Sequence, residues 1–227
     1  MNRRDLMEQI RHVGCFRLPA WEEIPERVTS RALRELCQSA LSRLSIEGEH
    51  PGLVTTSMLQ NYLRSGLLTR VEGKHYPREE VARLLLILIL KQILSLSEVK
   101  KVIELEWKRG ATQTVYAALS ETLSTILEEI SRVYFVACAP MPSEHKKELP
   151  IFMPAIQLKK DQLEWAALCQ CYGWYLCSRL LLSAGGMASL MPEPSLEDRM
   201  SDDKADENKF DRTEQLSRED VRGREKI

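Results

Sequence analysis

The run LLLILIL, residues 84–90, carries no polar atom in its side chains. A helix built from such a run is apolar on every side, so other elements must enclose it. Pro77 suits the first turn of this helix, and Glu79 and Glu80 favour the positive end of its dipole. We therefore expect a central buried helix that begins near residue 77 and ends near residue 94.

The composition is that of a soluble globular protein, with 227 residues of which 44% are hydrophobic and 29% are charged. The net charge of -1 conceals an uneven distribution. Residues 54–109 hold ten Lys/Arg and six Asp/Glu. This local excess of positive charge is compatible with nucleic-acid binding but is well short of a strong nucleic-acid-binding signal. Residues 191–227 hold twelve acids and eight bases, with Phe210 as their one aromatic residue. That composition predicts a disordered tail.

Hydrophobic periodicity predicts three further long helices. Thr29 or Ser30 can cap a helix that runs to about Leu44. A second helix spans about residues 111–135. A third, from about 160 to 182, is apolar enough to need a partner, either within the subunit or across an interface. Before them, residues 1–17 predict only a loose or weakly helical start.

The apolar segment 163–183 does not have the pattern of a membrane span. Its longest charge-free run, Trp165–Ser178, is 14 residues, whereas a span needs about 20. The start of the chain, MNRRDLMEQIRHVG, lacks the apolar core of a secretory signal. We therefore expect a cytoplasmic protein whose six cysteines are reduced thiols and which has no membrane partner.

Sequence patterns of known catalytic sites are missing: there is no P-loop, no dinucleotide fingerprint and no nucleophile elbow. Cys169 and Cys171 point about 200° apart on a helix, so we interpret them as small buried hydrophobes rather than metal ligands. We expect no enzyme activity, no metal and no cofactor. Four aromatic residues of the last helix are either core or the lining of a ligand pocket, with core favoured. They are Trp165, Tyr172, Trp174 and Tyr175.

The segment TTSMLQNYLRSG, residues 55–66, predicts a short capped helix followed by a left-handed glycine, Gly66. One side of this helix is inward and apolar, formed by Met58, Leu59, Tyr62 and Leu63. The other side is polar, formed by Ser57, Gln60, Asn61 and Arg64. Asn and Gln can pair with adenine, and Arg with guanine, from a helix in the major groove. This polar side suits a DNA reader, and it also fits the solvated side of any short amphipathic helix.

The next segment, LLTRVEGKHYP, predicts two very short strands joined at Glu72-Gly73, because glycine permits the positive φ of a tight turn. Arg70, Lys74 and His75 surround that turn. A hairpin over residues 68–76 could hold DNA phosphates, which fixes position on a duplex without reading its sequence. An ordinary surface hairpin carries such residues too. Further on, SLSE at residues 95–98 is a capping box that opens a helix through Trp107.

This order of reader helix, hairpin, buried helix and capped helix resembles the MerR-type winged helix-turn-helix. The resemblance covers about residues 55–107 and rests on MLQNYLRSGLL, KHYPREEVARLLLILILKQI and LSLSEVKKVIEL. It implies that Arg64 and Lys74 face DNA. The chain departs from the MerR pattern in having Gln60-Asn61 where MerR proteins carry Arg-Tyr. About ten residues, 45–54, also separate the reader from the helix before it.

Residues 18–183 are also similar to an uncharacterised bacterial family, domain of unknown function 1836. The similarity lies in LPAWEEIP, VTTSMLQNYLRSGLL and KHYPREEVARLLLILILKQILSLSEVK. It implies a shared fold and a role in transcription, and it supplies neither a ligand nor a target site.

The sequence therefore predicts a mainly α protein in four parts. Residues 1–28 are an N-terminal extension, and residues 29–109 form a MerR-like winged helix-turn-helix domain with one small hairpin. Residues 110–190 form a C-terminal helical layer for dimerisation or effector binding, and residues 191–227 form the disordered charged tail.

The expected function is that of a transcriptional regulator that binds double-stranded DNA as a homodimer. A small-molecule effector would bind in the C-terminal layer. The alternative is a protein-interaction module that keeps the fold without binding DNA. The candidate DNA-binding residues are Ser57, Gln60, Asn61, Arg64, Arg70, Lys74 and His75.

Overall fold

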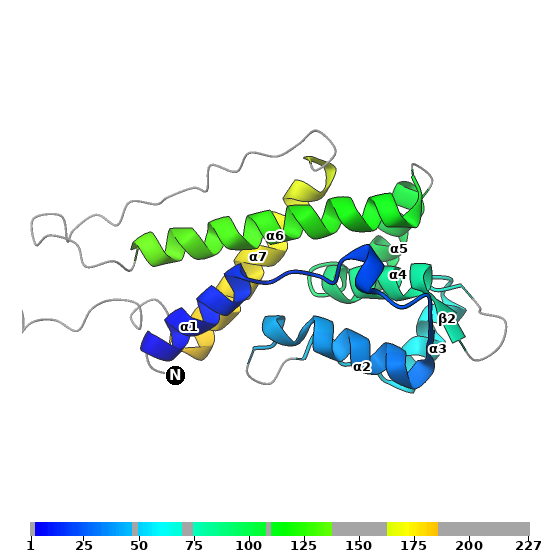
Figure 1. Cartoon of the computed structure of the whole chain (residues 1–227). Coiled ribbons are helices and arrows are strands. Elements are labelled where there is room, and N and C mark those ends of the chain that lie inside the picture. The colour runs from blue at the N-terminus through cyan, green and yellow to red at the C-terminus, as the bar shows by residue number, and fades with distance from the viewer. Residues whose placement is uncertain (1–2, 47–49, 70–74, 108–109, 138–162, 186–227) are drawn as a thin grey trace, which may run out of the picture. The chain divides into compact units, whose positions relative to one another are not determined.

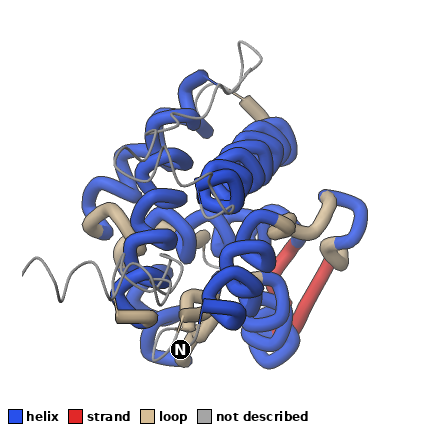
Figure 2. Tube along the Cα trace, turned by 90° about the vertical axis from the view of Figure 1, so that its left-hand side faces the viewer, coloured by secondary structure: helices blue, strands red, loops and turns tan. Residues whose placement is uncertain are grey.

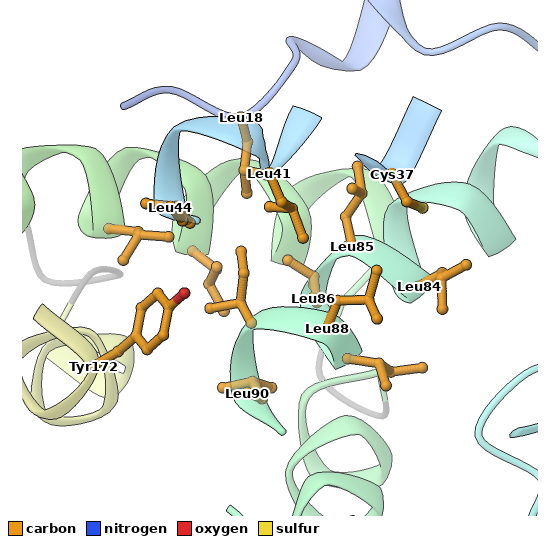
Figure 3. Close-up of a cluster of buried hydrophobic side chains, with 14 of the residues drawn as sticks. Leu18, Cys37, Leu41, Leu44, Leu84, Leu85, Leu86, Leu88, Leu90 and Tyr172 are labelled. Atoms are coloured by element: carbon orange, nitrogen blue, oxygen red, sulfur yellow. The ribbon is translucent and has the colours of Figure 1, made fainter. Parts of the chain in front are cut away.

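The apolar run lies in helix α4 (Arg78–Leu90), and all of its side chains from Leu84 to Leu90 are buried. In this computed structural model α4 contacts α2, α6, α7 and β2. Figure 3 shows leucines of α4 in one cluster with Leu41 and Leu44, which follow α2, and with Tyr172 of α7. The predicted central position of this helix is confirmed. The helix itself ends at Leu90, four residues before the expected end.

The structure describes residues 3–46, 50–69, 75–107, 110–137 and 163–185. They all belong to one unit, Met1–Leu190. The second unit, Met191–Ile227, corresponds to the expected disordered tail and lies outside the described residues. The described part is mainly helical, as predicted (Figure 1). Its short elements up to residue 77 are η1 (Trp21–Glu23), β1 (Arg27–Thr29), α2 (Ser30–Ala40), η2 (Ser42–Leu44), α3 (Thr56–Arg64) and β2 (His75–Pro77). The other helices are α1 (Arg3–Gly14), α4, α5 (Leu96–Trp107), α6 (Thr112–Ala137) and α7 (Leu163–Ser183).

A small antiparallel strand pair is present as predicted, but its composition differs from the expected 68–76 hairpin. Strand β2 pairs with β1 (Figure 2). In this pair Val28 lies opposite Tyr76. The residues expected to form the first strand start with Leu68, whose side chain is buried in the core. The expected turn at Glu72-Gly73 lies outside the described residues. The partner strand comes instead from the β-branched pair Val28-Thr29, a type of residue favoured in strands.

The expected boundary between an N-terminal extension, residues 1–28, and the next domain falls inside strand β1. The extension begins with a regular helix, α1, rather than with the loose or weakly helical start that was expected. Leu6, Ile10 and Val13 of α1 are buried, and α1 contacts α6 and α7. The Ser131 hydroxyl of α6 donates a hydrogen bond to the Ile10 carbonyl at 2.9 Å.

The segment between α1 and β1 is fastened to α4 and α6 by side-chain contacts. The Tyr116 hydroxyl donates to the Pro19 carbonyl at 2.8 Å, and the Trp21 ring meets the Tyr116 ring edge-on at a centroid distance of 6.2 Å. Arg78, at the start of α4, stacks 5.8 Å from the Trp21 ring centroid and donates to the Ile24 carbonyl at 2.6 Å. Trp21 thus anchors this segment to both helices.

The partner that α7 needs lies within the subunit, because α7 packs along α6. Trp165 and Tyr172 are buried core residues, in line with the favoured interpretation. At Gly173 the two helices approach closely: a Cβ there would lie 2.5 Å from the Ile130 Cδ1 atom. None of the described helices is both long and apolar enough to cross a bilayer.

Replacement of Gly14 by alanine tests the contact between α1 and α6. A Cβ at Gly14 would lie 2.4 Å from the Ser131 Cβ atom, which cannot move without shifting α6. We expect Gly14→Ala to lower the free energy of unfolding by about 1–3 kcal/mol, measured by denaturant titration. Gly110→Ala is the matched control, because the nearest atom to a Cβ there, in Thr114, is 4.0 Å away. Equal stability of the two variants would contradict the close packing of α1.

Candidate nucleic-acid interface

Helix α3 is short, and both of its ends are fixed by capping. The Thr55 hydroxyl accepts the Met58 backbone N–H at 3.2 Å, which satisfies a donor of the first turn. At the other end Gly66 has φ 73°, and the Leu67 N–H donates to the Tyr62 carbonyl at 2.9 Å. This is the left-handed glycine termination predicted from the sequence.

The two sides of α3 are divided as expected. Leu59 and Tyr62 are buried, and Met58 and Leu63 are partly buried against the core. All four predicted readers on the opposite side are exposed: Ser57, Gln60, Asn61 and Arg64. In Figure 1, α3 and β2 lie at the end of the described unit opposite α1. The polar side of α3 is therefore available to a partner.

Two of the predicted readers are joined by a hydrogen bond. The Arg64 guanidinium donates to the Asn61 side-chain oxygen at 3.0 Å, and its Nε donates to the Gln60 carbonyl at 3.4 Å. Both groups can exchange these exposed, local bonds for bonds to base edges. The pair also holds the Arg64 side chain over the last turn of α3.

The C-terminal end of α3 is held by a cation from α5. The Lys100 ammonium group donates to the Ser65 carbonyl at 2.8 Å. A cation at this position satisfies a carbonyl that the helix leaves unpaired, and it opposes the negative end of the helix dipole. From the sequence Lys100 was recognised only as part of the MerR-like pattern. The Ser95–Glu98 capping box that orients α5 is present as predicted, and its hydrogen bonds from Ser95 lower the pKa of Glu98.

A polar cluster around the buried carboxylate of Glu80 in α4 was not predicted. The Glu80 carboxylate, only 5% exposed, accepts the Thr69 N–H at 2.8 Å and pairs with the Arg83 guanidinium at 2.9 Å. The same guanidinium donates to the Thr69 hydroxyl at 3.0 Å. A buried carboxylate requires such partners, because an unpaired one is costly to remove from water. The Glu80–Arg83 spacing of three residues in a helix was the signal that could have revealed the pair.

The predicted phosphate-holding residues are only partly described. His75 is exposed on β2. Arg70 and Lys74 lie outside the described residues. Their placement relative to α3 is therefore a prediction from the sequence alone.

The long connection between α2 and α3 folds back onto α2. Residues 41–55 separate the two helices, whereas a helix-turn-helix motif has a turn of three or four residues. Pro51, Gly52 and Val54 of this connection are buried. A Cβ at Gly52 would lie 2.5 Å from the Cys37 carbonyl oxygen, so the connection lies directly against the last turn of α2. This packing brings the start of α3 back towards α2 despite the added length.

Metal ligands do not gather in the described part of the chain. It contains no group of three or more His, Cys, Asp or Glu side chains that could hold a metal ion. Cys37, Cys169 and Cys177 are buried, and burial raises the pKa of each thiol to about 12. The interpretation of Cys169 as a small buried residue is thus confirmed. That of Cys171 is wrong, because its side chain lies on the exposed side of α7.

Residues 19–120 match the family model of a domain of unknown function, DUF1836. The matched segment extends from just before η1 into α6 and includes all seven candidate DNA-binding residues. It is shorter than the similarity expected from the sequence, which extended to residue 183. Neither the curated proteins nor the solved structures include a significant match.

Thiol labelling tests the described burial. At pH 8 we expect the exposed Cys15 and Cys171 to react rapidly with a thiol reagent. The three buried thiols should react only after unfolding, because a pKa near 12 leaves almost no thiolate. Mass spectrometry of labelled peptides assigns each site, and the protein unfolded in guanidinium serves as the control. Labelling of Cys37 as fast as Cys15 in the native protein would contradict this packing.

Proposed function

We propose that this protein is a DNA-binding transcriptional regulator of MerR-like type. It reads base edges with α3 and holds phosphates with residues 68–76. The observation that supports this most is the exposed polar side of α3, which sits on a helix fixed by caps at both ends and by Leu59 and Tyr62 in the core. A binding site on such a fixed element loses little freedom when it binds.

The chemistry and size of α3 suit the major groove of B-DNA. The helix has nine residues and is about 13 Å long at 1.5 Å per residue, close to the groove width of about 12 Å. Gln60 and Asn61 can each form paired bonds with adenine, and Arg64 can do so with guanine. Ser57, one turn earlier on the same side, can reach a base or a phosphate.

The strand pair supports a compact winged unit around α3. Because Thr29 lies opposite His75, the chain that includes α2 and α3 begins and ends at the same pair of strands. The exposed His75 and the neighbouring basic residues Arg70 and Lys74 then follow the reader helix directly in the chain. In this proposal they contact the DNA backbone beside the groove that α3 enters.

The regulator is expected to act as a homodimer, because two related readers suit half-sites with two-fold symmetry. Helices α6 and α7 are the elements proposed to carry the contact between subunits. Leu163 and Leu182, at the two ends of α7, have exposed side chains. A small-molecule effector would act through the same helical layer.

A second candidate is a protein-interaction module that keeps the fold without DNA binding. Two observations favour it: the basicity of residues 54–109 is mild, and Arg64 already has a partner in Asn61. The two candidates differ in one measurable property. An interaction module would bind no duplex in preference to another.

Selection from a random DNA pool tests the proposal. We expect the full-length protein to enrich a motif with two-fold symmetry, with an affinity that falls at higher salt as counterions are released. Arg64→Ala should lower discrimination at one base position by about 1–3 kcal/mol, or roughly 5- to 150-fold, measured by competition between duplexes. Asn61→Ala should do the same at a neighbouring position.

Arg132→Ala provides the matched control. Arg132 is an exposed arginine of α6 that pairs with Glu129 three residues earlier, just as Arg64 pairs with Asn61. We expect this variant to retain the motif. Failure of the folded protein to enrich any sequence, in buffer and in cell extract, would contradict the proposed function.

A further inference from the structure

We propose that Lys100, together with the Glu80–Arg83 pair, sets the position of the DNA-reading end of α3. These three residues are named the α3 anchor. This inference rests on the proposed function and extends it to residues that do not face the groove. They are positioning residues, because they act on Arg64 and Asn61 through the backbone that follows them.

The first contact of the α3 anchor is made immediately after Arg64. The Lys100 Nζ atom donates to the carbonyl of Ser65, the C-cap of α3, at 2.8 Å. Lys100 is on α5 and 35 residues away in the chain, so this bond joins two separate helices. Its Nζ atom also lies 4.0 Å from a Glu104 carboxylate oxygen, which keeps the ammonium group on this side of α5.

The second contact lies beyond the left-handed turn at Gly66. Glu80 accepts the Thr69 N–H at 2.8 Å, and Arg83 donates to the Thr69 hydroxyl at 3.0 Å. Leu67 and Leu68, between the two contacts, are buried. The chain that follows Arg64 is thus attached to α5 at Ser65 and to α4 at Thr69.

These attachments matter because the last turn of α3 carries Arg64. Paired hydrogen bonds to a base demand close geometry, and a small displacement weakens them more than it weakens a phosphate contact. Loss of the α3 anchor should therefore reduce base discrimination more than total affinity. A residue that only stabilises the fold would lower the amount of folded protein and leave discrimination unchanged.

Lys100→Met is the decisive variant, since it keeps the aliphatic stem and removes the cation from a half-buried position. On the selected duplex we expect discrimination at the base position read by Arg64 to fall by about 5-fold, with the folded fraction unchanged. Lys101→Met is the matched control, because it removes the same charge from the next, exposed residue of α5. Lys100→Arg should restore most of the discrimination. The double variant Glu80→Met with Arg83→Met removes both hydrogen bonds to Thr69 without leaving an unpaired charge and should also lower discrimination.

A double-mutant cycle with Arg64→Ala completes the test. If the α3 anchor acts through Arg64, Lys100→Met should cause no further loss of discrimination at that position in the Arg64→Ala background. Unchanged discrimination in folded Lys100→Met, or equal losses in Lys100→Met and Lys101→Met, would overturn the inference and leave the proposed function intact. A wild-type protein that selects no sequence would overturn the proposed function and, with it, this inference.

Discussion

Burial of α4 is the interaction on which the arrangement of the other elements depends. The side chains from Leu84 to Leu90 are at most 3% exposed, and each buried aliphatic side chain contributes about 1.5–3 kcal/mol relative to exposure. Such a helix cannot lie at a surface, so elements from distant parts of the sequence must cover it. Helix α2, which precedes α3 in the chain, packs on α4, and so do α6 and α7 from the C-terminal half of the chain.

The first turns of α4 carry the polar groups that connect this core to its surroundings. Arg78 fastens the segment before β1 through the Ile24 carbonyl and the Trp21 ring. Glu80 and Arg83 fasten the chain that leaves α3. One end of the central helix therefore determines the position of the strand pair and of the proposed reader. This explains how a nine-residue helix, too short to be stable alone, can present a fixed polar side.

Helical periodicity and capping chemistry were sufficient to predict most of the helices from sequence. Thr55, Gly66 and the Ser95–Glu98 box mark helix ends through local contacts, and local contacts can be inferred from neighbouring residues. The strand pair could not be inferred in this way, because the partner of Tyr76 is Val28, far away in the chain. For the same reason the regular helix α1 was not predicted, since its buried side packs on α6 and α7 from the far end of the sequence.

In the candidate site, too, local features could be predicted from the sequence and contacts between distant residues could not. The exposure of Gln60 and Arg64 follows from the helical wheel, which needs only the spacing of apolar residues. The bonds that fix this helix in place involve Lys100 and Glu80 from two other helices, and no pattern within residues 55–66 points to them. The family match of residues 19–120 spans the proposed reader, the strand pair and the α3 anchor.

Photo-crosslinking is a direct test of whether the exposed side of α3 contacts bases. A photoreactive phenylalanine derivative would be placed at position 60 in the full-length protein and, for comparison, at position 132 on α6. With the DNA bound by the wild-type protein, we expect an efficient crosslink from position 60 to bases of the duplex and none from position 132. Bound DNA that crosslinks from position 132, or from neither position, would contradict base contact by α3.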